Sequence, residues 1–90
     1  VCEATSHVHL WEGGGPAALS GVTVRLVTGR NGLLSPGQLA SLSRPDDVHS
    51  PRCRLVWLEN THNRGGGTVY PPADVAAVAA WARAHGLALH

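Results

Sequence analysis

The chain has 90 residues and a mass of 9.4 kDa, which is enough for one small domain. Charged residues make up 14% of it and the net charge is +1, so we expect neither a disordered charged segment nor a polybasic surface for nucleic acids or membranes. The seven Lys+Arg positions are all arginine, which excludes a lysine Schiff base or a Walker-type lysine within these residues. Cys2 and Cys53, the only cysteines, are expected to be reduced.

The first half of the chain predicts short elements separated by glycine and proline. In chain order we expect a helix N-cap at Thr5 or Ser6, a break at 13–16, a helical turn over 17–20 closed by Gly21, a strand over 22–27, a turn over 28–32, and a helix over 36–42 opened by Ser35 and Pro36. A polar loop with two prolines follows at 44–52.

The second half predicts one strand–loop–helix–strand unit. Residues 54–59 form an apolar run that ends in a charge, which is typical of a buried parallel strand. A helix is expected over 72–85, with Gly86 after its end and an apolar stripe formed by Val75, Val78, Ala79 and Ala82. Residues 87–89 begin another strand, so the unit is expected to be a right-handed parallel crossover.

The polar residues 59–63 follow the first strand of this unit. Ligands of open α/β sheets bind beyond the carboxyl ends of the strands. Asn and Thr also commonly build hydrogen-bonded turns, so the residue types alone leave a binding site and a structural turn open.

Six histidines are many for a chain of this length. His7 and His9 would face one side on a strand, as metal ligands often do, but would diverge on a helix. No third ligand has a suitable spacing, so we expect no metal site. His49 follows Asp46 and Asp47 and is either a general base or an exposed loop residue.

Five motifs occur in a characteristic order. They are H-x-x-x-x-E-G-G-G-P-A-A-L-S-G at 7–21, R-P-D-D-V-H at 44–49, L-E-N-T-H-N at 58–63, G-G-x-V-x-P at 66–71 and H-G-L-A-L-H at 85–90. In this combination the chain resembles the low-specificity L-threonine aldolases, within the β-eliminating-lyase group of fold-type-I pyridoxal-phosphate (PLP) enzymes. Arg64 and Gly65 lengthen one loop relative to that family.

The resemblance implies an α/β fold, a partial three-layer α/β/α sandwich with a mostly parallel sheet. Residues 1–90 would be the central part of the PLP-binding large domain, truncated at both ends, with the cofactor-binding lysine beyond residue 90. It further implies cleavage of L-threonine or L-allo-threonine to glycine and acetaldehyde by a cytoplasmic homo-oligomer that binds neither nucleic acid nor membrane. The 90 residues alone are expected to be inactive because they contain no lysine.

The resemblance also implies roles for individual residues. His7 matches the histidine that stacks on the pyridine ring of PLP, and His49 matches the histidine near the substrate hydroxyl. His49, or His7 with a bound water, would accept the hydroxyl proton during retro-aldol cleavage. The other implied cofactor-binding residues are Glu12, Glu59, Asn60, Thr61 and His62.

Three alternatives stay open at this point. The chain could act within a β-eliminating lyase for another amino acid, with ammonia and a keto acid as products. It could be a non-catalytic module whose histidines bind a metal or a protein. It could also be a remnant that does not fold alone, because a parallel sheet needs both faces covered.

Overall fold

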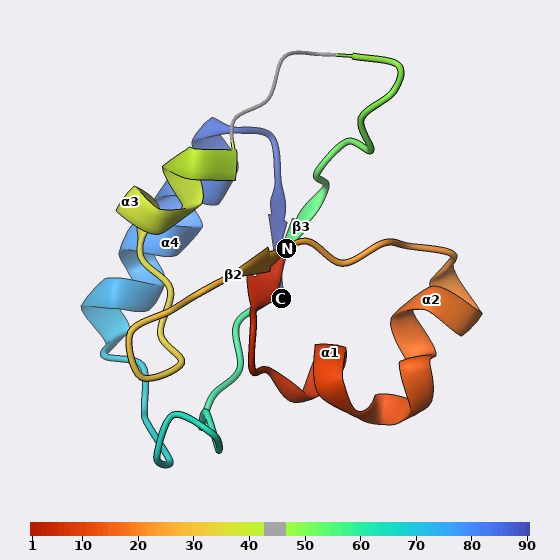
Figure 1. Cartoon of the computed structure of the whole chain (residues 1–90). Helices are drawn as coiled ribbons and strands as arrows, with labels where there is room; N and C mark the ends of the chain where they lie inside the picture. Colours follow the sequence, from red (N-terminus) through yellow and green to blue (C-terminus); the bar gives the residue numbers. More distant parts are fainter. Residues whose placement is uncertain (43–46) are drawn as a thin grey trace.

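The computed structural model of the chain describes residues 1–42 and 47–90, which form an α/β structure with short parallel strands (Figure 1). Its strands are β1 (Cys2–Glu3), β2 (Leu26–Val27), β3 (Leu55–Val56) and β4 (Ala88–Leu89). Its helices are α1 (His7–Leu10), α2 (Gly15–Ser20), α3 (Pro36–Leu39) and α4 (Pro72–Ala84), with 3₁₀ turns η1 (Glu12–Gly14) and η2 (Ala40–Leu42).

The strands form two parallel pairs, and hydrogen bonds made by Val1 connect one pair to the other. β1 pairs with β2, and β3 pairs with β4, both in parallel. The amino group of Val1 donates to the carbonyl of Leu55 at 2.8 Å, and the N–H of Trp57 donates to the carbonyl of Val1 at 2.8 Å. The strands therefore lie side by side in the order β2–β1–β3–β4. The parallel unit predicted from the second half of the sequence is confirmed.

The direction of the connections changes between the first two strands and the rest. The chain passes from β1 to β2 by way of α1 and α2, then crosses back beyond β1 to reach β3, and continues through α4 to β4. Accordingly, α1 and α2 lie on one side of the strands and α3 and α4 lie on the other (Figure 1). Parallel crossovers of the same handedness place helices on opposite faces when the direction of strand addition reverses. The reversal occurs between β1 and β3, so a topological switch point lies between the carboxyl ends of these two strands.

The core lies between the strands and the pair α3 and α4. Its buried members are Leu34, Leu39, Leu42, Val56, Val78 and Ala82. The predicted stripe of α4 is confirmed, since Val78 and Ala82 are buried on it and Val75 and Ala79 are half-buried. α3 begins as predicted: Oε1 of Gln38 accepts bonds from the N–H and the hydroxyl of Ser35 at 2.8 and 2.9 Å.

Some predicted strands are too long and one element was missed. The strand predicted over 22–27 is paired only at Leu26–Val27, because β1 is itself only two residues long. The strand predicted over 54–59 is assigned at Leu55–Val56, although Leu58 N–H still donates to the carbonyl of His90 at 2.9 Å. β1 had not been predicted, since a run of two residues shows no alternation.

None of the helices in residues 1–42 and 47–90 combines the length and the apolar character that a transmembrane span requires. Both cysteines are free thiols, with Cys2 buried and Cys53 half-buried.

Candidate functional site

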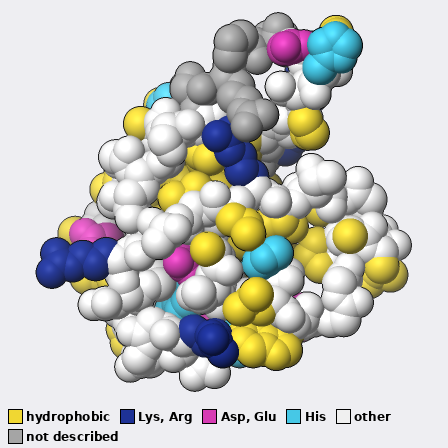
Figure 2. Space-filling model, in the orientation of Figure 1, with side chains coloured by type: hydrophobic (Ala, Val, Ile, Leu, Met, Phe, Trp, Pro, Cys, Tyr) yellow, Lys and Arg dark blue, Asp and Glu magenta, His cyan; other side chains and the backbone are white. Residues whose placement is uncertain are grey.

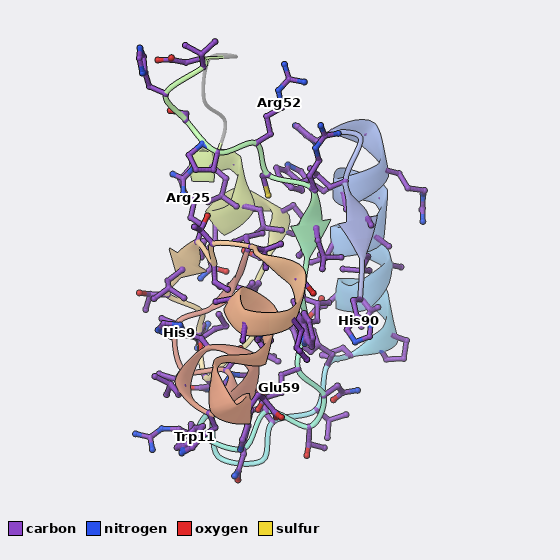
Figure 3. The ribbon with its side chains drawn as sticks, turned by 90° about the vertical axis from the view of Figure 1, so that its right-hand side faces the viewer. His9, Trp11, Arg25, Arg52, Glu59 and His90 are labelled. Atoms are coloured by element: carbon purple, nitrogen blue, oxygen red, sulfur yellow. The ribbon has the colours of Figure 1, made fainter. Side chains whose placement is uncertain are left out.

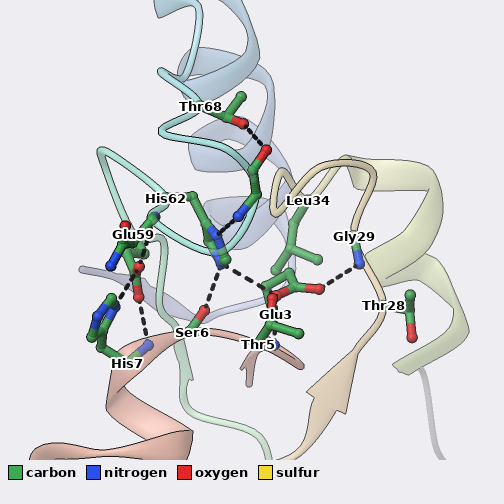
Figure 4. Close-up of polar contacts among 12 residues, drawn as sticks. Glu3, Thr5, Ser6, His7, Thr28, Gly29, Leu34, Glu59, His62 and Thr68 are labelled. Atoms are coloured by element: carbon green, nitrogen blue, oxygen red, sulfur yellow. Dashed lines mark hydrogen bonds and ion pairs between the residues drawn. The ribbon is translucent and has the colours of Figure 1, made fainter.

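A histidine–carboxylate pair occupies the switch point between β1 and β3. His7 begins α1 just after β1, and Glu59 follows β3. The backbone N–H of His7 donates to Glu59 Oε2 at 2.6 Å, and ring Nδ1 lies 2.7 Å from Glu59 Oε1 (Figure 4). The two contacts together fix the carboxylate against both the backbone and the ring of His7.

Glu59 is ionised in this arrangement. Burial raises the pKa of Glu59, but hydrogen bonds from the backbone and ring of His7 and from the backbone of Asn63 outweigh it and hold the pKa below its ordinary value. An ionised carboxylate only accepts hydrogen bonds, so Nδ1 of His7 carries the proton. In the neutral ring, Nε2 is then left with its lone pair and can accept a proton from a ligand.

The His7 ring is partly open to solvent and is braced by an aromatic neighbour. Its side chain is 36% exposed, while that of Glu59 is 14% exposed. The ring of Trp11 lies 4.8 Å away between centroids, tilted by 36°. The guanidinium of Arg64 lies over Trp11, 5.4 Å from the ring centroid. Planar groups therefore line this edge of the molecule.

A second histidine–carboxylate pair, His62 and Glu3, lies buried beside the first (Figure 4). The N–H of Gly65 donates to His62 Nδ1 at 3.0 Å, so Nδ1 has no proton and the other ring nitrogen carries one. That nitrogen, Nε2, lies 3.2 Å from Glu3 Oε2 and 3.5 Å from Ser6 Oγ. Both ring nitrogens of His62 are thus engaged by protein groups, and the side chain holds the loop of Glu59 in place.

Glu3 was missed by the sequence reasoning. Its Oε2 accepts bonds from the N–H and the hydroxyl of Thr5, both at 2.6 Å, and its Oε1 accepts one from Gly29 N–H at 3.0 Å. Burial raises the pKa of Glu3, but these hydrogen bonds and the nearby His62 outweigh it, so the pKa is lowered. No periodic pattern marks a lone buried carboxylate in so short a strand, so nothing in the sequence singled it out.

The remaining predicted cofactor-binding residues lie in two segments, 60–61 in the loop after β3 and Glu12 in η1. Asn60 accepts a bond from Tyr70 N–H at 3.2 Å through Oδ1, which ties the loop to the start of α4. Thr61 and Glu12 are exposed. Among the bonds of the described residues, none joins these side chains to the ring of His7, and Glu12 instead contributes to the wall of a cavity at the amino-terminal ends of the strands.

The structure does not bring His49 to His7. The segment 47–52 lies at the opposite end of the molecule from α1 (Figure 1), and Arg52 and Glu59 mark these two ends in Figure 3. His49 is exposed, and its backbone N–H donates to Asp47 Oδ1 at 2.8 Å. Asp46, which belongs to the same motif, lies outside the described residues.

The histidines do not gather into a metal centre. His7 and His9 lie on helix α1, where residues two apart diverge. Among residues 1–42 and 47–90, no group of three or more His, Cys, Asp or Glu side chains is placed to hold a metal ion.

A largely apolar cavity of about 1430 Å³ lies away from the His7–Glu59 pair, at the amino-terminal ends of the strands. Hydrophobic side chains gather there, where the lobe containing α2 meets the rest of the molecule (Figure 2). Trp57 and Trp81 contribute to its wall, and Glu12 lies at its edge. Apolar surface dominates its lining, which also includes charged residues such as Asp47 and Arg54 but neither His7 nor Glu59. The switch point is the stronger candidate site because it holds the hydrogen-bonded His7–Glu59 pair at the carboxyl ends of parallel strands.

Comparisons with known proteins agree with the motifs. A probable low-specificity L-threonine aldolase 2 of Arabidopsis thaliana is 36% identical over 88 residues, and the low specificity L-threonine aldolase of Escherichia coli K12 is 35% identical over 86 residues. Each alignment covers 94% of this chain and 25% of the relative. The aldolase vrtJ of Penicillium aethiopicum is 38% identical over 92 residues, covering 100% of this chain and 23% of that protein. The chain thus spans about a quarter of the length of these relatives. The sequence model of the beta-eliminating lyases matches residues 1–90, and the chain therefore belongs to the beta-eliminating lyase family.

Proposed function

We propose that these 90 residues are part of a PLP-dependent aldolase that cleaves L-threonine or L-allo-threonine to glycine and acetaldehyde. The observation that carries the proposal is the His7–Glu59 pair, in which Nδ1 lies 2.7 Å from a carboxylate oxygen at the carboxyl ends of two parallel strands. Family membership and the aldolase names of the relatives support the same chemistry.

The residues present fit a flat, electron-poor cofactor ring. The His7 ring is held in place by Glu59 and remains partly exposed, so it offers an aromatic surface for stacking. Glu12, Asn60 and Thr61 would supply polar groups around that ring, and His62 would hold their loop in place. When bound, PLP supplies an electron sink for the two electrons released as the Cα–Cβ bond of the substrate breaks.

His7 would accept the proton of the substrate hydroxyl. Its Nε2 lone pair is available because Glu59 holds the proton on Nδ1. Proton transfer to Nε2, directly or through a water, would leave a charged ring that the Glu59 carboxylate stabilises. Glu59 thereby acts as a positioning residue for His7.

His49 remains the second candidate for this proton, as the family resemblance implies. In the structure its segment lies at the other end of the molecule from α1, so the geometry favours His7. In the whole protein we also propose a three-layer sandwich fold, a homo-oligomer and a cytoplasmic location.

The first experiment is a product assay on the full-length protein that contains these residues, with L-threonine and PLP. We expect equimolar acetaldehyde and glycine, and loss of both in His7→Asn. The exposed His9→Asn variant on the same helix is the matched control and should keep its activity. Ammonia and a keto acid in place of acetaldehyde would instead show a different lyase and overturn the aldolase proposal.

The 90-residue chain by itself should show no turnover, because it contains no lysine. After addition of PLP and borohydride, we expect peptide mapping by mass spectrometry to find no reduced adduct on any side chain. A side-chain adduct would contradict this expectation, whereas an adduct on the α-amino group of Val1 would not.

A further inference from the structure

Arg64 has a position that the reaction proposed above does not use. It lies in the loop that precedes Gly66, and its guanidinium packs over the indole of Trp11 at 5.4 Å from the centroid. Trp11 is 45% exposed and lies against the ring of His7. We propose that Arg64 and Trp11 form a binding site for an anionic group, a carboxylate or a phosphate, at the edge of the His7–Glu59 pair.

The hydrogen-bond donors of Arg64 remain available in this arrangement. The contact with the Trp11 ring is a cation–π contact, and none of the five N–H groups of Arg64 donates a hydrogen bond within residues 1–42 and 47–90. The ion pairs of the described residues join His7 to Glu59 and Glu3 to His62, and no carboxylate in residues 1–42 and 47–90 pairs with Arg64. A planar fork of unpaired donors matches two oxygens of a carboxylate or phosphate.

The backbone on both sides of Arg64 is held in place. On one side, the N–H of Asn63 lies 3.4 Å from Glu59 Oε1. On the other, Gly65 donates to His62 Nδ1 at 3.0 Å and accepts a bond from the Thr68 hydroxyl at 2.8 Å. Gly65 also packs so closely on Asn31 that a Cβ would lie 2.1 Å from its carbonyl oxygen. The arginine therefore starts from a fixed point, which lowers the entropy lost when it binds an anion.

The identity of the anion depends on the proposed function, but the existence of the site does not. Two sources share the required chemistry: a carboxylate on the amino-acid substrate and the phosphate of the cofactor. Both would place oxygens beside a flat group that stacks on His7.

The test is a titration of the cofactor-free full-length protein that contains these residues with inorganic phosphate and with succinate at constant ionic strength, followed by tryptophan fluorescence. We expect saturable quenching that Trp11→Phe removes and that Arg64→Gln weakens about tenfold, as the loss of a charge-assisted hydrogen-bonded contact predicts. Arg64→Lys keeps the charge but loses the forked arrangement of donors, so its affinity for the anions should lie between those of the unchanged chain and Arg64→Gln. Arg83→Gln removes an exposed arginine of α4 and should bind like the unchanged chain.

Equal binding by the unchanged chain and Arg64→Gln, or no saturable quenching by either anion, would overturn the proposal. Circular dichroism of each variant shows whether a loss of binding comes from unfolding, and Arg64→Lys decides the result if Arg64→Gln does not fold. The two sources separate in a parallel titration with pyridoxal and pyridoxal 5′-phosphate. If pyridoxal 5′-phosphate binds more tightly than pyridoxal and Arg64→Gln abolishes this difference, the anion is the cofactor phosphate. If Arg64→Gln leaves the ratio of these two affinities unchanged but weakens succinate binding, the anion is the substrate carboxylate. None of these readouts requires turnover, so failure of the aldolase proposal would be seen separately.

Discussion

At the scale of single residues, the chemistry of the candidate site depends on one carboxylate that makes two hydrogen bonds to one histidine. Glu59 bonds the backbone of His7 at 2.6 Å and its ring at 2.7 Å. The first bond fixes where the carboxylate lies, and the second determines which ring nitrogen carries the proton. A histidine without such a partner would divide its proton between the two nitrogens and would turn more freely.

We expect Glu59→Gln to lower kcat of the full-length protein by about 10²-fold, the lower range for the loss of general-base catalysis. The amide has one accepting oxygen where the carboxylate has two, so it cannot accept from both the backbone N–H and the ring Nδ1–H of His7. It also supplies no counter-charge for a charged imidazole, so the ring is held less firmly in one tautomer and its charged form is less stable. Steady-state kinetics measure the rate, and ¹⁵N chemical shifts of the His7 ring measure the tautomer. Unchanged kcat together with unchanged ring shifts would show that Glu59 does not position His7.

At the scale of elements, two loops far apart in sequence are packed through a glycine. The turn that contains Gly32 lies directly on the His62 ring, where a Cβ would be 2.3 Å from Cγ and Nδ1. Gly32 also has φ of +81°, a region in which an L side chain is strained. The loop around Glu59 thus depends on a residue without a side chain in another segment.

We expect Gly32→Ala to destabilise the chain by about 1–3 kcal/mol more than Gly66→Ala, because it adds overpacking to backbone strain. Gly66 has φ of +96° and no neighbour within 4 Å of its would-be Cβ, so it controls for the strain alone. Urea unfolding of the two variants measures the difference. Equal free energies of unfolding would mean that the loop moves away from Gly32 without cost.

At the scale of the whole molecule, the buried Glu3–His62 pair joins three parts of the chain. Glu3 belongs to β1 and accepts a bond from Gly29, which follows β2, while His62 belongs to the loop after β3. A small domain buries a limited apolar surface and is only marginally stable. The loss of one buried polar contact between distant segments therefore removes a large fraction of its free energy of unfolding.

This pair predicts loss of stability in acid. The pKa of Glu3 is below its ordinary value of 4.5 in the folded chain, because its hydrogen bonds outweigh the effect of burial. Its contribution is therefore complete above about pH 5 and is lost as the pH falls through the lowered pKa. Urea unfolding at a series of pH values from 7 to 3 should show this decline, with a smaller contribution from Glu59, whose pKa is lowered as well.

Glu3→Gln is the matched variant for the acid measurement. We expect it to lose about 1–3 kcal/mol at pH 7, the cost of an impaired buried hydrogen-bond network, and to show a shallower decline below pH 5. An unchanged decline would assign the acid sensitivity to other carboxylates.

The sequence predicted the parts of the fold that depend on local preferences. α4 has its apolar stripe, α3 begins at its Ser35–Gln38 contact, and Gly21 ends α2 with φ of +61°. Backbone preference and side-chain spacing act over a few residues, so a single segment contains the information for them. The motifs likewise led to the family, since they are local patterns of residue types.

The tertiary structure alone decided the order of the strands, the pairing of His7 with Glu59 and the burial of Glu3 with His62. The pairing of Cys2 with Leu26 spans 24 positions, and the contacts of Val1 with Leu55, His7 with Glu59 and Glu3 with His62 each span 52 or more. It also separated His49 from His7, although both were predicted for one site. Contacts between residues so far apart in sequence form only when the intervening chain folds and brings the two segments together, and a local sequence pattern does not contain that information.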